Sequence, residues 1–179
     1  MTARTVFLDR DGVINRAVVR AGKPYPPASV SETEVPEEVA PALARLRAAG
    51  YRLVVVTNQP DVAAGRQRRD VVEAINGALS TRLPLDEIRV CYHGDADACA
   101  CRKPMPGLLL QSPAQEVGRS VLVGDRWRDI EAGRRAGVRA TVLIDRGYAE
   151  GCRVEPDARV RSLTEAVDWI LALDEGTRP

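Results

Sequence analysis

The sequence has 179 residues, of which 45% are hydrophobic and 28% are charged, and these values are typical of one soluble globular domain. The 26 basic and 25 acidic residues leave a net charge of only +1, so the chain lacks the basic excess that nucleic-acid-binding proteins use against phosphates. We therefore expect a single domain over residues 1–179 without a nucleic-acid partner.

Short apolar runs alternate with helical patterns along the chain. Continuous apolar strands are typical of a parallel sheet that is covered on both faces. The predicted strands are Thr5–Leu8, Leu53–Val56, Ile88–Cys91, Val121–Val123 and Thr141–Ile144. The predicted helices are Glu37–Ala49, Gln67–Leu83, Gly107–Val117, Trp127–Ala136 and Leu163–Leu173. This alternation predicts an α/β fold, with a Rossmann-like, doubly wound, five-stranded and mostly parallel sheet.

Local signals mark several boundaries of these elements. Gly50 and Gly137 suit helix ends, and Ser162 with Glu165 matches a capping box at the start of the last helix. The segment Arg16–Pro36 contains four prolines and no clear element. Loops of this length in compact domains are often functional, so we expect this one to lie near the site.

The N-terminal segment MTARTVFLDRDG contains no apolar run long enough for a signal peptide, and no part of the sequence approaches the length of a membrane span. We therefore expect a cytoplasmic protein that does not associate with membranes. In a reducing compartment, cysteines that lie close together in the sequence indicate metal binding more than disulfides.

Pairs of carboxylates follow two of the predicted strands directly. Asp9 and Asp11 follow the first strand, and Asp125 and Asp129 follow the fourth. Ligands of such sheets bind at the carboxyl ends of the strands, where these acids would form one pocket. An acidic pocket requires a cation, and oxygen ligands favour Mg²⁺. The alternative is that these aspartates cap helices and form turns, which is strongest for Asp129 and weakest for Asp9.

Polar residues that suit phosphate binding follow the second strand and the cysteine-rich segment. Thr57, Asn58 and Gln59 offer a hydroxyl and amides at a strand end, although an ordinary turn has the same composition. Lys103 is one of only two lysines in the chain and lies beside the cysteines. A solvated surface lysine is the alternative, but its position favours a role in the site.

Cys91, His93, Cys99 and Cys101 lie within eleven residues and include the only histidine. These residue types at short range match a closed tetrahedral Zn²⁺ site. The alternative is a set of core cysteines beside a surface histidine. The remaining Cys152 is expected to be an ordinary thiol. If His93 binds zinc, no histidine remains for a Ser-His-Asp or Cys-His system, and a carboxylate becomes the natural nucleophile.

The chain resembles the haloacid dehalogenase (HAD) superfamily of phosphotransferases, whose four motifs occur here in order. They are FLDRDGVIN at 7–15, VTNQ at 56–59, RKP at 102–104, and GD at 124–125 followed by Asp129. The C-x-H and C-x-CRKPxPG segments and VGD-xxx-DIEAG narrow the resemblance to the branch of D-glycero-D-manno-heptose-1,7-bisphosphate phosphatases and histidinol phosphatases. The similarity spans about residues 4–148. It implies a HAD fold with a zinc-stabilised loop and no large cap domain, and we expect a monomer.

The resemblance also implies a role for each motif residue. Asp9 would attack phosphorus to form an aspartyl-phosphate, and Asp11 would protonate the leaving oxygen and then activate water. Thr57 and Lys103 would hold the transferred phosphoryl group. The residues implied to recognise substrate are Asn58, Gln59, Arg102 and Arg126. Those implied to bind Mg²⁺ are Asp9, Asp125 and the main-chain carbonyl of Asp11, with Asp129 supporting them indirectly.

Two segments depart from the pattern of the family. Pro60–Gly65 lacks the Ser-Gly loop that is more usual after TNQ, and Arg20–Pro27 differs from the better-known heptose enzymes. Both flank the expected site, so the chemistry is better defined than the substrate. The leading hypothesis is a heptose-1,7-bisphosphate 7-phosphatase in the synthesis of nucleotide-activated heptose. The alternatives are a phosphatase for histidinol phosphate or another small monoester, and a non-enzymatic, zinc-stabilised protein that binds phosphate or a partner.

Overall fold

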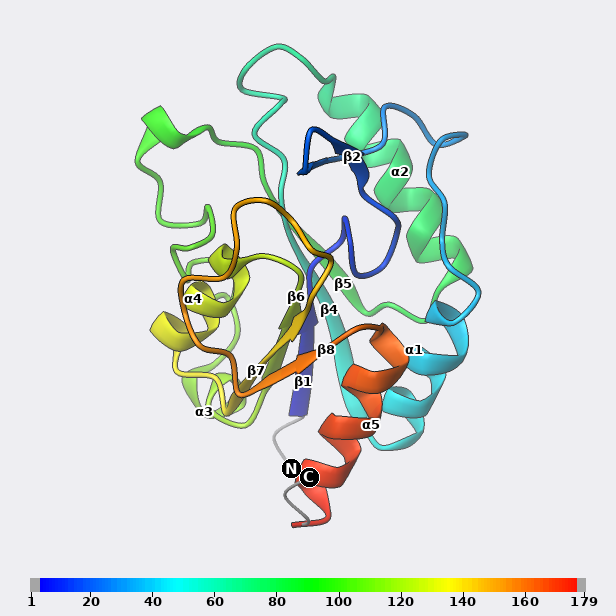
Figure 1. Cartoon of the computed structure of the whole chain (residues 1–179), viewed down its shortest axis with the longest axis vertical. Coiled ribbons are helices and arrows are strands. Elements are labelled where there is room, and N and C mark those ends of the chain that lie inside the picture. Colours follow the sequence, from blue (N-terminus) through cyan, green and yellow to red (C-terminus); the bar gives the residue numbers. More distant parts are fainter. Residues whose placement is uncertain (1–3, 177–179) are drawn as a thin grey trace.

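A six-stranded parallel sheet forms the centre of the computed structural model, which describes residues 4–176 apart from the side chains at positions 114 and 115 (Figure 1). The strand order is β5-β4-β1-β6-β7-β8. The strands are β1 (Arg4–Leu8), β4 (Tyr51–Asn58), β5 (Glu87–Cys91), β6 (Val121–Gly124), β7 (Ala140–Ile144) and β8 (Ala158–Val160). The predicted α/β fold with a doubly wound parallel sheet is confirmed.

Helices cover both faces of this sheet, as Figure 1 shows. On one face, side chains such as Leu8 and Val55 pack against α1 (Val39–Ala48), α2 (Arg69–Arg82) and α5 (Leu163–Asp174). On the other face, Phe7 and Val54 pack against α4 (Trp127–Ala136) and the turn at 106–110, with the short α3 (Ala114–Val117) nearby. Because successive residues of a strand point to opposite faces, both sets must be apolar, which explains the continuous apolar runs.

Two predicted elements need correction. The sheet has a sixth strand, β8, which sequence reasoning missed because it is short and half exposed, with a charged residue at its centre. The predicted helix Gly107–Val117 is wrong, because only residues 114–117 are helical. Pro113 explains the break, since its ring disfavours helical backbone at the preceding residue and it has no N–H to donate to an earlier turn.

The segment Arg16–Pro36, for which the sequence predicts no helix or strand, contains a small antiparallel hairpin. Its strands are β2 (Val18–Arg20) and β3 (Lys23–Tyr25), paired from Val18 opposite Tyr25 to Arg20 opposite Lys23. The two-residue turn is formed by Ala21 and Gly22, with φ values of 48° and 74°. Positive φ at both positions matches the twist of a tight hairpin.

The predicted helix boundaries are largely confirmed. Gly137 ends α4 in the left-handed region with φ 76°. The Ser162 hydroxyl accepts a hydrogen bond from the Glu165 backbone N–H at 3.1 Å and so caps α5. The second half of the capping box differs, because the Glu165 carboxylate accepts from the Arg161 backbone N–H. No helix within residues 4–176 has both the length and the apolar character needed to cross a membrane.

Candidate active site

Three buried carboxylates meet at the edge of the sheet where the parallel strands end. Asp9 follows β1, Asp125 follows β6, and Asp129 lies in the first turn of α4. One oxygen atom from each carboxylate lies within 4.8 Å of the other two, and none of these residues is more than 7% exposed. A Cβ on Gly124 would lie 2.2 Å from the Cβ of Asp129, so only glycine permits this approach.

Lys103 supplies positive charge inside this carboxylate cluster. Its ammonium group donates to Asp9 Oδ1 at 2.8 Å and to the carbonyl of Val56 at 2.7 Å, and it pairs with Asp129 Oδ1 at 2.5 Å. Burial opposes the charge on Lys103, but the carboxylates of Asp129 and Asp9 outweigh it and raise the pKa of the lysine. Asp129 also accepts a hydrogen bond from the Arg126 backbone N–H at 3.1 Å, so it caps α4 as well.

The cluster carries more negative charge than one lysine neutralises. Burial raises the pKa of Asp9 to about 6, with Lys103 opposing the shift and Asp129 adding to it. Burial, followed by the charges of Asp9 and Asp129, also holds the pKa of Asp125 well above its ordinary range. In addition, Asp125 Oδ1 is buried without a hydrogen-bond partner. This set of hard oxygen donors fits a divalent cation such as Mg²⁺.

Tyr148 and Gly12 fix the orientation of Asp125. The Tyr148 hydroxyl donates to Asp125 Oδ2 at 2.6 Å, which leaves Oδ1 as the unpartnered oxygen. Gly12 has a φ of +94°, and a Cβ there would lie 1.8 Å from Asp125 Oδ2, so another residue would be strained and would clash. Sequence reasoning missed Tyr148, because a loop tyrosine carries no signal that places it beside a carboxylate 23 residues earlier.

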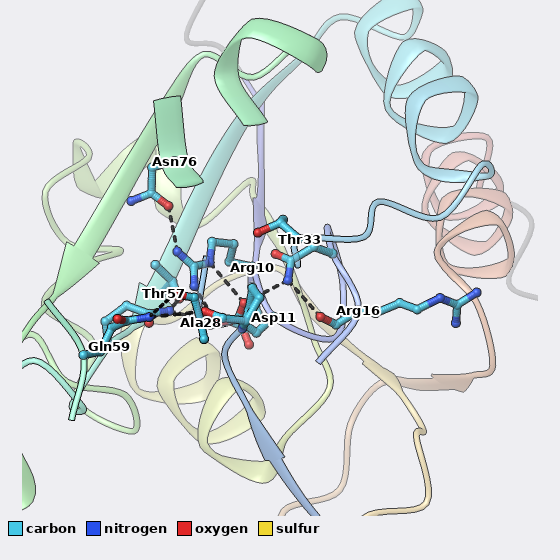
Figure 2. Close-up of polar contacts among 12 residues, drawn as sticks. Arg10, Asp11, Arg16, Ala28, Thr33, Thr57, Gln59 and Asn76 are labelled. Atoms are coloured by element: carbon cyan, nitrogen blue, oxygen red, sulfur yellow. Dashed lines mark hydrogen bonds and ion pairs between the residues drawn. The ribbon is translucent and has the colours of Figure 1, made fainter. Parts of the chain in front are cut away.

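A partly buried hydrogen-bond network holds the side chain of Asp11 (Figure 2). Arg10 donates through Nε to Asp11 Oδ1 at 3.1 Å and through Nη2 to Oδ2 at 3.0 Å. Gln59 donates to Oδ2 at 2.8 Å and Asn15 to Oδ1 at 3.0 Å. Arg10 is completely buried and is itself anchored on α2 by a 2.9 Å bond to Asn76 Oδ1. Both oxygens of Asp11 are therefore fixed by donors, and the carboxylate lies outside the cluster of Asp9, Asp125 and Asp129.

The three polar residues at the end of β4 differ in their contact with the pocket. Thr57 and Asn58 line the pocket described below, whereas Gln59 lies behind it, 1% exposed. The Gln59 amide donates to Thr57 Oγ1 at 3.0 Å in addition to Asp11. Asn58 accepts from the backbone N–H of Lys103 at 3.0 Å and donates to its carbonyl at 2.9 Å. Asn58 thus anchors the segment that carries the site lysine.

A pocket of about 360 Å³ opens above the carboxylates, a volume suited to a small metabolite. Its base contains Asp9, Asp11, Thr57, Lys103 and Asp129. Its walls come from the β2–β3 hairpin, the loop after β4, and the segments at the start of α4 and after β7. The wall residues that the sequence did not single out individually are Lys23, Pro24, Tyr25, Pro26, Pro60, Asp61, Arg66, Arg128 and Glu150.

The two predicted substrate-binding arginines differ in position. Arg126 lines the pocket, where Glu150 accepts from its Nε at 2.5 Å and its Nη2 at 2.8 Å. Arg102 does not line the pocket, and its Nε donates to Asp95 Oδ1 at 2.8 Å. The structure therefore brings Arg126 to the predicted site and leaves Arg102 beside the cysteine-rich loop.

The four predicted zinc ligands lie together at the end of β5 and in the loop that follows. The Sγ atoms of Cys91, Cys99 and Cys101 are 3.1–3.7 Å apart, and His93 Nδ1 is 3.3 Å from Cys101 Sγ and 3.5 Å from Cys91 Sγ. Ligands of a tetrahedral zinc with 2.3 Å bonds would be about 3.7 Å apart, so this donor set fits Zn²⁺. All four cysteines of the chain are free thiols. Lys103 follows Cys101 by two residues, so a metal here would steady the segment that enters the active site.

Known proteins with similar sequences and structures indicate the family of this chain. A family model described as HAD-hydrolase-like matches residues 100–166. The D-glycero-beta-D-manno-heptose-1,7-bisphosphate 7-phosphatase of Helicobacter pylori strain J99 is 30% identical, over 94% of this chain and 98% of the relative. The enzyme of the same name from Escherichia coli K12 is 33% identical, over 93% of this chain and 87% of the relative.

A solved structure has the same fold. The D,D-heptose 1,7-bisphosphate phosphatase from B. bronchiseptica, crystallised with magnesium and phosphate, superposes with a TM-score of 0.76 and 29% sequence identity. The match covers 95% of this chain and 99% of that one. The fold, the strand-end carboxylates and these relatives lead to one assignment: the chain belongs to the HAD superfamily of phosphatases, in the family of the heptose-1,7-bisphosphate 7-phosphatases.

Proposed function

We propose that the protein hydrolyses the 7-phosphate of D-glycero-D-manno-heptose 1,7-bisphosphate with Asp9 as the nucleophile. The observation that carries this proposal is the buried Asp9 carboxylate at the base of the pocket, held by Lys103 beside two further carboxylates. The names of the relatives support the substrate. The product, heptose 1-phosphate, would then serve the synthesis of a nucleotide-activated heptose.

The positions of Asp9, Thr57 and Lys103 at the pocket support the following reaction. An oxygen of Asp9 attacks phosphorus, the bond between phosphorus and the sugar oxygen breaks, and Asp11 gives a proton to the departing oxygen. Asp11 then accepts a proton from a water molecule that attacks phosphorus of the aspartyl-phosphate, which releases phosphate and restores Asp9. Lys103 and Thr57 hold the oxygens of the transferred group, since phosphoryl transfer depends mainly on positioning and charge neutralisation.

We assign the magnesium site to Asp9, Asp125 and the main-chain carbonyl of Asp11. The unpartnered Oδ1 of Asp125 and the raised pKa of Asp9 support this set. Bound Mg²⁺ would neutralise phosphate charge and lower the cost of burying these carboxylates together. Asp129 acts through Lys103 and the start of α4. We assign the zinc site to Cys91, His93, Cys99 and Cys101, as a structural site.

The test of the substrate is a panel of phosphate esters with Mg²⁺ present. It contains the α and β anomers of heptose 1,7-bisphosphate, histidinol phosphate and fructose 1,6-bisphosphate, and phosphate release gives kcat/KM for each. We expect a preference of at least tenfold for one heptose anomer. Similar efficiency for all four compounds would contradict the heptose assignment, and a preference for histidinol phosphate would replace it with the other activity of the branch.

A further inference from the structure

The β2–β3 hairpin forms one wall of the active-site pocket, through Lys23, Pro24, Tyr25 and Pro26. Its conformation is restricted at both ends of β3. The tight turn at Ala21 and Gly22 precedes it, and the prolines fix their own φ angles. The turn and β3 of this hairpin lie in the segment Arg20–Pro27, which departs from the family pattern and to which the catalytic mechanism assigns no role.

The loop after β7 holds the hairpin against the catalytic residues. The backbone N–H of Ala149 donates to the carbonyl of Gly22 at 3.0 Å, and a Cβ on Gly22 would lie 3.0 Å from that of Ala149. The same short loop binds Asp125 through Tyr148 and Arg126 through Glu150. The turn of the hairpin and the residues around the reacting carboxylates therefore share one support, so the pocket wall has a defined position relative to Asp9.

The cations around the pocket differ in whether an acid already pairs with them. Five line it, and four have carboxylate partners: Arg66 with Asp61, Arg126 with Glu150, Arg128 with Asp95, and Lys103 with Asp9 and Asp129. Lys23 is the fifth, and within residues 4–176 it has no ion-pair partner. Lys23 is an exposed residue that lines the pocket, and it belongs to the hairpin rather than to the strand ends that carry Asp9.

We propose that Lys23 binds the phosphate that is not transferred, and so makes a sugar bisphosphate a better substrate than the corresponding monophosphate. This inference rests on the proposed function and adds the residue that selects for the second phosphate. A lysine ammonium is a flexible point charge that binds phosphate without the fixed geometry of arginine. A substrate anion at Lys23 displaces water alone, whereas at the paired arginines it competes with a carboxylate.

The test compares Lys23→Met with wild type on two substrates that differ only in the second phosphate, heptose 1,7-bisphosphate and heptose 7-phosphate. The quantity measured is the ratio of their kcat/KM values. We expect this ratio to fall about tenfold in Lys23→Met, the effect of losing one charge-assisted hydrogen bond of about 1.4 kcal/mol. The fall should come from a higher KM for the bisphosphate. Lys23→Arg keeps the charge and should retain most of the ratio.

Arg16→Met is the matched control. It removes one positive charge at the base of the same hairpin, from an exposed side chain that pairs with Glu34 and does not line the pocket. This variant should keep the wild-type ratio. An equal fall in Arg16→Met would show a general charge effect, and an unchanged ratio in Lys23→Met would overturn the inference.

The two proposals fail in different ways. If wild type prefers fructose 1,6-bisphosphate to both heptose compounds, the heptose assignment fails. The same ratio, measured with fructose 1,6-bisphosphate and fructose 6-phosphate, then decides the role of Lys23. If wild type hydrolyses mono- and bisphosphates with equal efficiency in every pair, no second-phosphate site exists and the inference on Lys23 is overturned.

Discussion

Replacement of Arg10 by methionine would remove the buried guanidinium that holds Asp11. The variant loses two charge-assisted hydrogen bonds to Asp11 and one to Asn76, in a site where the Arg10 side chain is fully buried and that of Asp11 is 15% exposed. Removing one partner of a buried ion pair costs about 3–5 kcal/mol. Gln59 and Asn15 still donate to Asp11 in this variant, so we expect the free energy of unfolding to fall by the lower value, about 3 kcal/mol. The free energy of unfolding of a typical domain is roughly 5–15 kcal/mol.

The effect on catalysis should depend on the leaving group. If Arg10 positions Asp11 to protonate the departing oxygen, a misplaced Asp11 should lower kcat/KM by about 10²-fold for a sugar phosphate. The loss should be about tenfold or less for 4-nitrophenyl phosphate, whose leaving group needs little protonation. Arg10→Lys keeps the charge but loses the planar guanidinium, so its kcat/KM on both substrates should lie between those of wild type and Arg10→Met.

Two assays check this prediction. Urea unfolding gives the loss of stability, and phosphate release at saturating Mg²⁺ gives kcat/KM for both substrates in the folded variant. An equal loss on both substrates would mean that Arg10 supports the fold without positioning a proton donor. Sugar-phosphate activity within twofold of wild type would refute the reasoning altogether.

The remaining predictions concern the metals and the nucleophile. Tyr148→Phe should raise the Mg²⁺ dissociation constant, measured by calorimetry, about tenfold because Asp125 loses its fixed orientation, and an unchanged constant would contradict this role. The raised pKa of Asp9 means that its contribution to metal-free stability, on the order of 3 kcal/mol, is present below pH 4 and lost as pH rises through about 6. Mg²⁺ should therefore stabilise the protein more at pH 7 than at pH 5 in thermal melts, and this difference should shrink in Asp9→Asn. Cys101→Ser should lower the melting temperature and abolish binding of one Zn²⁺ per chain, whereas Cys152→Ser should change neither.

The strands and the carboxylate cluster were predictable because their signals are local. Apolar runs mark the central strands, and Asp9 and Asp125 directly follow two of them. Parallel strands place such residues at one edge of the sheet, so proximity follows from topology alone. The proximity of Cys91, His93, Cys99 and Cys101 was predictable for the same reason, since these four residues come from one strand end and the loop after it.

The partners that hold these residues were not predictable. Arg10 donates to Asn76, which lies 66 residues later in the sequence. A charged residue next to a strand end gives no sequence signal that its side chain is buried. Glu150 pairs with Arg126 across 24 positions and comes from a loop without an apolar pattern. The prediction of a helix at 107–117 was wrong because it followed the apolar spacing of this segment and ignored Pro113, which interrupts the helix. Contacts between loops that are distant in the sequence can be identified only in the folded structure, because no periodic pattern in the sequence indicates them.

Trapping of the covalent intermediate tests the central claim most directly. Heptose 1,7-bisphosphate labelled with ³²P at the 7-phosphate is mixed with enzyme and Mg²⁺, quenched in acid within milliseconds, and the labelled peptide is identified by mass spectrometry. The account predicts label on Asp9, chased into free phosphate by unlabelled substrate and absent in Asp9→Asn. Label on another residue, or rapid turnover by Asp9→Asn, would contradict it.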